Sequence, residues 1–286
     1  MLPFKKILLP IDYSAACDAV MPYAKEFASH FSAEVTMVHA YGAEALAYSD
    51  LPLIDPRIAD EAHQGECRRL TEFAHSVFPD DHVECFPRLG EAGKIVEEVV
   101  RHQGTDLVMM STHGRGPVRK LLLGSVTSKV LHDVSAAVWT ITGTALEQRG
   151  QNFACKTILC AVDESDETDA VLMAAAAMAR FYDGELRVVH VVGLPVEASR
   201  FDYEYCRKTL VEAAQFNLCE AMVRLNLDAP HAVLEGFPGD RLREEAVKHH
   251  ADLIVTGRGR AQATVSRAWS RLYPIIRESP CPVLSL

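Results

Sequence analysis

The chain lacks the two glycine-rich signatures by which common nucleotide-binding folds are recognised. The apolar segment 4–11 is followed by DYSAACD and not by the GxGxxG of dinucleotide-binding proteins. No GxxxxGK[ST] occurs anywhere in the sequence, which excludes a P-loop NTPase. A nucleotide site, if the chain has one, must therefore use another loop.

Long apolar runs and paired cysteines are also missing. No run approaches the length that crosses a bilayer, and MLPFKKILLPID carries no signal-peptide cleavage pattern. None of the 8 cysteines forms a CxxC pair, so we expect small buried thiols and no disulfide framework. These absences favour a cytoplasmic protein without a membrane partner.

Positive charge is scarce as well. With 29 Lys and Arg against 39 Asp and Glu, the formal net charge is −10. An acidic chain repels phosphate backbones, which argues against a nucleic-acid partner.

The chain contains the same series of sequence blocks twice. KKILLPIDYS (5–14) recurs as KTILCAVDES (156–165), and VTMVHAY (35–41) as LRVVHVV (186–192). TDLVMMSTHG (105–114) recurs as ADLIVTGRGR (251–260), and DVSAAVWTI (133–141) as ESPCPVLSL (278–286). Four blocks in the same order indicate an internal duplication. We predict two domains, 1–145 and 153–286, joined by the polar segment GTALEQRGQN (143–152).

Each half alternates short β-branched runs with helical periodicity. In the first half we predict strands at 4–11, 34–40, 82–87, 106–111 and 137–142, and helices at 15–31, 57–77, 92–102 and 118–134. This alternation predicts an α/β fold: two tandem doubly wound domains, each a five-stranded parallel sheet flanked by helices. Ligands of such folds bind at the carboxyl ends of the strands.

The stretch STHGRGPVRKLLLGS (111–125) follows the fourth predicted strand and has the composition of an anion cradle. Glycines let the backbone approach a phosphate, and the amide groups at a helix N-terminus favour negative charge. The Ser125 hydroxyl can donate to phosphate oxygens, and Arg115, Arg119 and Lys120 supply positive charge.

These residues resemble the universal stress proteins, whose nucleotide-binding members carry G-x2-G-x9-G-[ST] after the fourth strand and an Asp at the end of the first. The matching residues here are Ser111, Gly114, Gly124 and Ser125, with ILLPIDYS, the strand end VHA and SPCPV adding to the likeness. The resemblance covers nearly the whole chain as two copies.

The resemblance implies an adenine nucleotide, ATP with or without Mg²⁺, in the first domain. Asp12 matches the residue at adenine and ribose, and Pro10 and Ala40 match the lining of the base pocket. The remaining matches are the approach to the loop and the phosphate cradle: Met110, Ser111, Gly114, Arg115, Gly124, Ser125 and Val126.

Two departures from the family pattern affect what we expect of nucleotide binding in the two halves. Ser111 replaces a glycine, which costs affinity if that position needs a positive φ or an uncrowded backbone. In the second half Trp269 falls at the position of Gly124, and Pro274 is expected to interrupt the following helix. We therefore expect that the second half does not bind ATP. The alternative is that Arg258 and Arg260 bind a different anion.

Three functions stay open on sequence grounds. The first is a stress-response or signalling protein that binds ATP in its first domain, with the second as a pairing or regulatory partner. The second is a slow ATPase, for which only Asp12 and His113 are near; His113 could act as a base, and we predict no catalytic residue. The third is a scaffold without nucleotide.

The resemblance also implies pairing of the two domains through their last strands, and a homodimer is a further expectation. We expect His39 and His190 to be structural.

Overall fold

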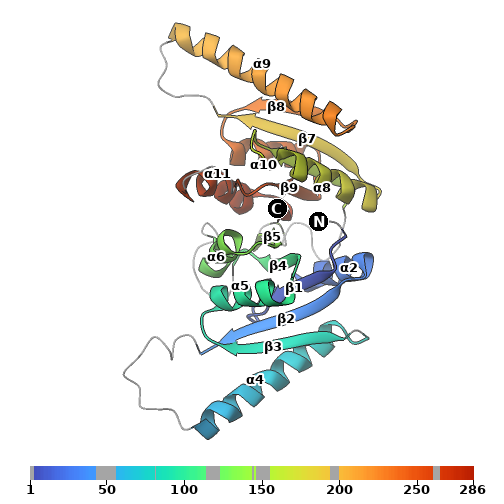
Figure 1. Ribbon diagram of the computed structural model, residues 1–286, viewed down its shortest axis with the longest axis vertical. Helices are drawn as coiled ribbons and strands as arrows, with labels where there is room; N and C mark the ends of the chain where they lie inside the picture. Colours follow the sequence, from blue (N-terminus) through green and yellow to red (C-terminus); the bar gives the residue numbers. More distant parts are fainter. Residues whose placement is uncertain are drawn as a thin grey trace. The chain divides into compact units, whose positions relative to one another are not determined.

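A computed structural model describes residues 3–42, 56–80, 82–113, 123–143, 145, 155–193, 200–259 and 265–286. The chain divides into two compact units, residues 3–139 and 140–286, drawn in blue to green and in green to red in Figure 1. Among the helices of the described ranges, none combines the length and the apolar character needed to cross a bilayer.

The first copy of the repeat is a sheet in the order β3-β2-β1-β4-β5. Registers such as Ile7 opposite Val35 and Ile7 opposite Leu107 are parallel. The elements are β1 (Lys6–Pro10), α1 (Ala15–Asp18), α2 (Met21–Phe31), β2 (Glu34–Tyr41), α4 (Pro56–Val77), β3 (Val83–Leu89), α5 (Ala92–Gln103), β4 (Leu107–Ser111), α6 (Ser125–Asp133) and β5 (Ala137–Ile141). The division between the compact units falls inside β5.

The second copy repeats this order as β8-β7-β6-β9-β10. Its elements are β6 (Thr157–Val162), α8 (Thr168–Phe181), β7 (Glu185–Val192), α9 (Arg200–Arg224), β8 (His231–Glu235), α10 (Pro238–Lys248), β9 (Leu253–Thr256), α11 (Val265–Glu278) and β10 (Val283–Ser285). The predicted fold class, two tandem α/β domains with parallel sheets, is confirmed.

The central strands are apolar because both faces of each sheet are covered. Leu8 and Leu9 of β1 are fully buried, as are Leu107 and Val108 of β4. Aromatic rings fill one side of the first core, where Phe4 meets Phe31 edge-on at 5.3 Å. This packing holds the carboxyl ends of β1 and β4 in place, which is where the candidate site lies.

Three local predictions were wrong. The helix expected at 15–31 is two helices, because α1 ends at Asp18 and α2 restarts at Met21. The helix expected at 118–134 is not continuous, because Gly124 is not helical (φ −59°, ψ 147°) and α6 begins at Ser125; residues 118–122 are outside the described residues. Pro274 does not interrupt its helix: α11 runs through it to Glu278. A Cβ built on Gly239 of α10 would lie 2.7 Å from Cβ of Pro274, so the missing side chain makes room for the ring.

Candidate functional site

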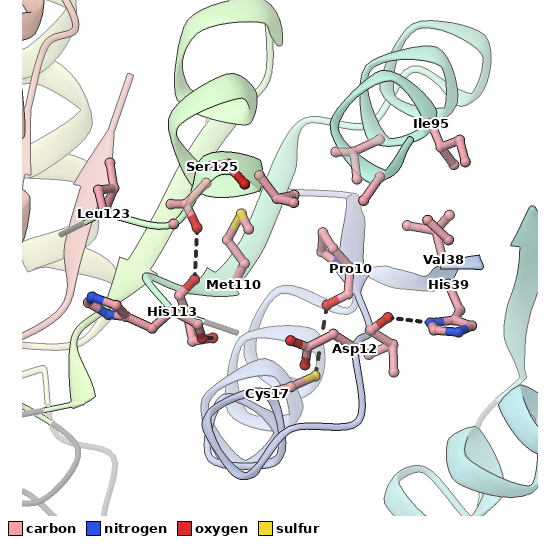
Figure 2. A pocket seen from close by; sticks show the side chains of 18 residues that line it. Pro10, Asp12, Cys17, Val38, His39, Ile95, Met110, His113, Leu123 and Ser125 are labelled. Atoms are coloured by element: carbon pink, nitrogen blue, oxygen red, sulfur yellow. Dashed lines mark hydrogen bonds between the residues drawn. The ribbon is translucent and has the colours of Figure 1, made fainter. Parts of the chain in front are cut away.

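A cavity of about 570 Å³ opens at the carboxyl ends of the strands in the first unit. Its walls come from the ends of β1, β2 and β4, the face of α5 and the start of α6 (Figure 2). The lining residues are Pro10, Ile11, Asp12, Cys17, Val38, His39, Ala40, Ala92, Ile95, Val96, Met110, Ser111, His113, Leu123, Gly124, Ser125, Val126 and Thr127.

Eight of the ten sequence-predicted site residues lie together in this lining: Pro10, Asp12, Ala40, Met110, Ser111, Gly124, Ser125 and Val126. Gly114 and Arg115 are outside the described residues, as are Arg119 and Lys120. Ile95 and Val96 could not be predicted as lining residues, because an apolar stripe on a helix looks the same in a sequence whether it faces a core or a ligand. What these residues bind stays a prediction.

The two ends of the cavity differ in chemistry. Val38 and Ile95 stand at one end, whereas Ser125 and His113 stand toward the other, with Met110 and Pro10 between them (Figure 2). Asp12 is the only Asp, Glu, Lys or Arg among the described lining residues. The cavity thus offers an apolar slot at one end, one carboxylate beside it, and polar donors at the other end.

A tight turn after β1 positions the Asp12 carboxylate. Its Oδ1 accepts the backbone N–H of Ser14 at 3.0 Å, and the Ser14 hydroxyl caps α1 by accepting the N–H of Cys17 at 3.1 Å. Between them Tyr13 has a φ of 57°, a left-handed conformation that turns its ring away from the strand. One oxygen of Asp12 is thereby fixed to the backbone, so the carboxylate is held in a set orientation.

Ser111 occupies its position without backbone strain, since its φ is not positive. Its hydroxyl donates to the carbonyl of His113 at 2.8 Å and closes the first turn of the loop. The expected cost of replacing glycine therefore finds no support in the backbone conformation: serine is accommodated and contributes a hydrogen bond that glycine lacks.

Gly124 is required by the loop itself. Its N–H donates to the carbonyl of Thr112 at 2.9 Å, and a Cβ built on it would lie 3.1 Å from that same oxygen. The Thr127 hydroxyl ties the other side of the junction by donating to the carbonyl of Ser111 at 3.2 Å. These contacts clamp the start of α6 onto the end of β4.

The first turn of α6 presents backbone donors to the cavity. The first hydrogen bond within the helix runs from the N–H of Ser128 to the carbonyl of Gly124. The amides of Ser125, Val126 and Thr127 come before it and therefore have no acceptor within the helix. Gly124 provides no side-chain cap. Free amide groups with the helix dipole behind them make this end of the cavity suited to an anion.

His113 lies in the lining beside this turn. Its Nδ1 is 2.8 Å from the Thr112 hydroxyl, whereas its Nε2 is buried and has no hydrogen-bond partner within the described chain. A buried ring nitrogen without a partner costs about 1–3 kcal/mol, which a ligand atom could recover. The other ionisable side chains of the described lining are those of Asp12, Cys17 and His39.

His39 and His190 have the same structural role in the two copies. The Nδ1 of His39 meets the carbonyl of Ile11 at 2.7 Å, and that of His190 meets the carbonyl of Val162 at 2.9 Å. Each ring thus fastens the second strand of its sheet to the end of the first strand.

In the second unit the matching loop is already occupied by the protein's own groups. The amide of Gly259 donates to Oε2 of Glu167 at 2.9 Å, and a Cβ on Gly257 would lie 3.0 Å from the same oxygen. Arg258 is buried, with its Nε donating to the carbonyl of Leu286 at 3.1 Å. The cavity beside this loop measures about 70 Å³. Arg258 therefore has a structural role, in that its side chain binds the carbonyl of Leu286. Arg260 is outside the described residues.

The start of the following helix also differs between the copies. The helix α11 begins at Val265, so Trp269 lies inside it, whereas Gly124 directly precedes α6. The expectation that Trp269 takes the place of Gly124 before the helix is therefore wrong. Because α11 continues through Trp269, the free backbone donors of a helix N-terminus do not lie at Trp269.

The described residues contain no cluster of three or more His, Cys, Asp or Glu that could hold a metal ion. His249 pairs with Glu245 on α10, and His231 faces Cys219 on α9. All 8 cysteines are free thiols.

The fold and the cavity together define a class: tandem doubly wound α/β repeats with a ligand-sized cavity at the carboxyl ends of the first sheet. The universal stress protein family model matches residues 3–142 and again residues 154–285. The chain therefore belongs to the universal stress protein family and carries two tandem copies of its domain, as the sequence resemblance predicted.

Individual relatives agree with this assignment. A universal stress protein of Thermus aquaticus is 33% identical over 132 residues, which are 45% of this chain and 96% of the relative. One from Methanocaldococcus jannaschii is 26% identical over 143 residues, 45% of this chain and 88% of the relative. Each relative thus corresponds to about half of this chain.

Solved structures show the same fold over the whole length. The crystal structure of a universal stress protein from Archaeoglobus fulgidus has a TM-score of 0.69 at 21% identity, covering 98% of this chain and 95% of that one. A second structure, from Pseudomonas aeruginosa, has a TM-score of 0.70 at 14% identity, covering 99% and 93%. At these identities the likeness concerns the fold alone.

Proposed function

We propose that the protein is a stress-response or signalling protein of the cytoplasm that binds ATP in the cavity of its first domain. The observation that carries this proposal is the cavity of about 570 Å³, which joins an apolar slot to the open first turn of α6. Such a volume lies within the range of small-molecule sites, roughly 300–1,000 Å³. The second domain acts as a pairing or regulatory partner.

The chemistry of the lining suits the parts of the nucleotide in order. Val38, Ile95 and Pro10 supply apolar surface for a purine ring. The Asp12 carboxylate, held by the Ser14 amide, can accept hydrogen bonds from ribose hydroxyls. The first-turn amides of α6 and the Ser125 hydroxyl would donate to phosphate oxygens. Gly114 and Arg115 remain part of the proposed cradle through the motif that they match.

The second domain is proposed to have no such site. The Glu167 carboxylate stands against the Gly259 amide, so a phosphate would meet a negative charge already in place. The small volume beside the loop supports the same conclusion, since about 70 Å³ does not hold a nucleotide.

Matched substitutions at Asp12 and Asp163 test the proposal. Asp12→Asn keeps an oxygen for the Ser14 amide but removes the charge, and it should weaken ATP binding about tenfold by calorimetry. Asp163→Asn makes the same change in the second domain and should leave ATP affinity unchanged. Equal effects of the two substitutions, or no ATP binding by the parent protein, would reject the proposal.

The alternative functions are separated by two further measurements. Release of ADP over hours from the ATP complex would indicate a slow ATPase, with His113 as the residue to replace first. Absence of any heat of binding would favour the scaffold. We rank the binding function first because Asp12 is the only carboxylate in the described lining, whereas an ATPase needs a group that positions water as well as one that holds a metal ion.

Pairing of the domains through their last strands is retained as part of the proposal. A terminal sheet strand presents unpaired backbone groups, and a partner strand is one way to cover them. Small-angle scattering of the whole chain would give its dimensions and its oligomeric state, including any homodimer.

A further inference from the structure

The second unit has a cavity that is separate from the small space beside its glycine loop. It measures about 220 Å³ and lies between α9 and the ends of β6 and β7. Its lining consists of Val162, Asp163, Glu164, Ser165, Thr168, His190, Ala214, Asn217, Leu218, Glu220, Ala221 and Arg224. A dry cavity of about 150 Å³ can admit a benzene molecule, so this one can hold a small organic ligand.

In the first unit a cluster of large side chains occupies the corresponding place. The ring of Tyr13 packs on His39 at 4.7 Å and on Phe73 at 5.6 Å. The Arg69 guanidinium lies 3.9 Å from the centre of the Tyr13 ring, and a Glu66 carboxylate oxygen lies 3.6 Å from Nε2 of His39. Tilted and edge-on ring contacts, together with the contact between Glu66 and His39, thus fill the space.

The second copy replaces the members of this cluster by smaller ones. Glu164 stands at the place of Tyr13, directly after the strand-end Asp in the repeated block. Asn217 contacts Glu164 at 2.9 Å, as Arg69 contacts Tyr13. In the register that this contact sets, Ala214 takes the place of Glu66 and Ala221 that of Phe73, and both alanines line the cavity. The cavity is therefore the volume that these replacements leave.

His190 is the one member that stays, and it now lacks the carboxylate. Its exposure is 8%, so it is more than nine-tenths buried. Its Nδ1 faces the carbonyl of Val162 and must carry the proton, which leaves a lone pair on Nε2 in the neutral ring. Within the described part of the chain Nε2 has no hydrogen-bond partner. Because His190 lines the cavity, a ligand there could donate a hydrogen bond to this nitrogen.

The charges around the cavity select the sign of that ligand. Asp163, Glu164 and Glu220 contribute carboxylates. The Arg224 guanidinium is engaged by the Asp169 carboxylate, at 2.6 Å and 3.2 Å. Val162, Leu218 and the two alanines give the floor an apolar character. A cation with a short aliphatic body satisfies the acidic rim and the floor together.

We propose that this cavity binds a short aliphatic amine that carries a second hydrogen-bond donor. Its ammonium group lies among the rim carboxylates, its carbon chain covers the apolar floor, and its second donor meets Nε2 of His190. The site is independent of ATP binding in the first domain.

Three four-carbon probes that differ in charge test the selection: a terminal amino alcohol, the matching diol and the matching hydroxy acid. In NMR titrations of the whole chain, with its histidine side chains labelled, the amino alcohol should shift the His190 ring signals in a saturable manner. The His39 signals serve as the internal control and should not move. The diol should bind at least about tenfold more weakly and the hydroxy acid not at all, because the rim is acidic. No saturable shift of His190 with the amino alcohol, or equal shifts with the acid, would overturn the proposal.

Two substitutions locate the binding. Glu164→Gln keeps the shape and an acceptor for Asn217 but removes a charge, so the affinity for the amino alcohol should fall about tenfold. Glu164→Tyr installs the residue of the first copy and should abolish the His190 shift by filling the space. Since Glu164 is exposed, both variants are expected to fold. Unchanged binding in Glu164→Gln would overturn the proposal even if Glu164→Tyr failed to fold.

Discussion

Ser125 allows the anion-binding role of α6 to be tested without disturbing the helix. It is the first helical residue, where proline is favoured because the N–H has no intrahelical partner. The preceding Gly124, at φ −59° and ψ 147°, already has the conformation that a following proline requires. Ser125→Pro therefore removes the backbone donor and the hydroxyl while the fold is retained, and Ser125→Ala removes the hydroxyl alone.

The expected losses follow from counting donors. A hydrogen bond to a charged group contributes about 1.5–3 kcal/mol, and each 1.4 kcal/mol is about tenfold in affinity. Ser125→Ala should weaken ATP binding about tenfold. Ser125→Pro loses two donors and should weaken it about 100-fold or more. Stability should be unchanged or raised by up to about 1 kcal/mol, because proline restricts the unfolded chain.

Calorimetry with ATP and with adenosine, together with urea unfolding, completes the measurement. Adenosine lacks the phosphates, so its affinity should be the same in the parent and in both variants. If Ser125→Pro bound ATP as tightly as Ser125→Ala, the backbone amide would have no part in phosphate binding. If both bound like the parent, the start of α6 would not be the anion site.

Three further predictions concern stability and reactivity. Gly65→Ala lies within α4, where a Cβ meets nothing within 4 Å, and it should stabilise the fold by about 0.5–1 kcal/mol in urea unfolding. The pKa of Asp133 is lowered, first by its hydrogen bond from Lys129, so this pair stabilises the fold above the unfolded-state pKa and the benefit disappears as pH falls through the folded-state pKa. Lys129→Met should therefore lower the unfolding midpoint at neutral pH, and a midpoint equally lowered in strong acid would contradict this. Burial raises the pKa of Cys17 to about 11, so mass spectrometry should show slow alkylation at pH 8, whereas exposed Cys206 reacts readily.

The sequence was sufficient to predict which strand ends lie around the cavity, because those ends are marked by residues that also have local roles. Asp12 follows one apolar run and Ser111 ends another, and both runs are the buried strands β1 and β4. In a parallel sheet these ends necessarily meet. The eight described candidates therefore lie around one cavity, although their contacts with a ligand remain predictions.

Tertiary contacts account for what the sequence did not predict. The role of Gly124 depends on the Thr112 carbonyl, which lies in the loop before the undescribed segment, and no local pattern reports that approach. The α11 helix runs through Pro274, whose ring packs closely against Gly239 of α10, and no local sequence pattern indicates that contact. Ile95 and Val96 face a cavity instead of a neighbouring helix, and periodicity does not distinguish the two.

The two copies show how the fold persists while its sites diverge. The bonds from His39 to Ile11 and from His190 to Val162 tie the strand ends together through backbone carbonyls, and so they do not depend on any ligand. Because this framework is independent, side chains at its edge are free to change. Glu167 can then supply an internal anion to the glycine loop, and Glu164 can open a new cavity on the other side of the same strand end. One framework thereby supports a proposed nucleotide site in one copy and a proposed amine site in the other.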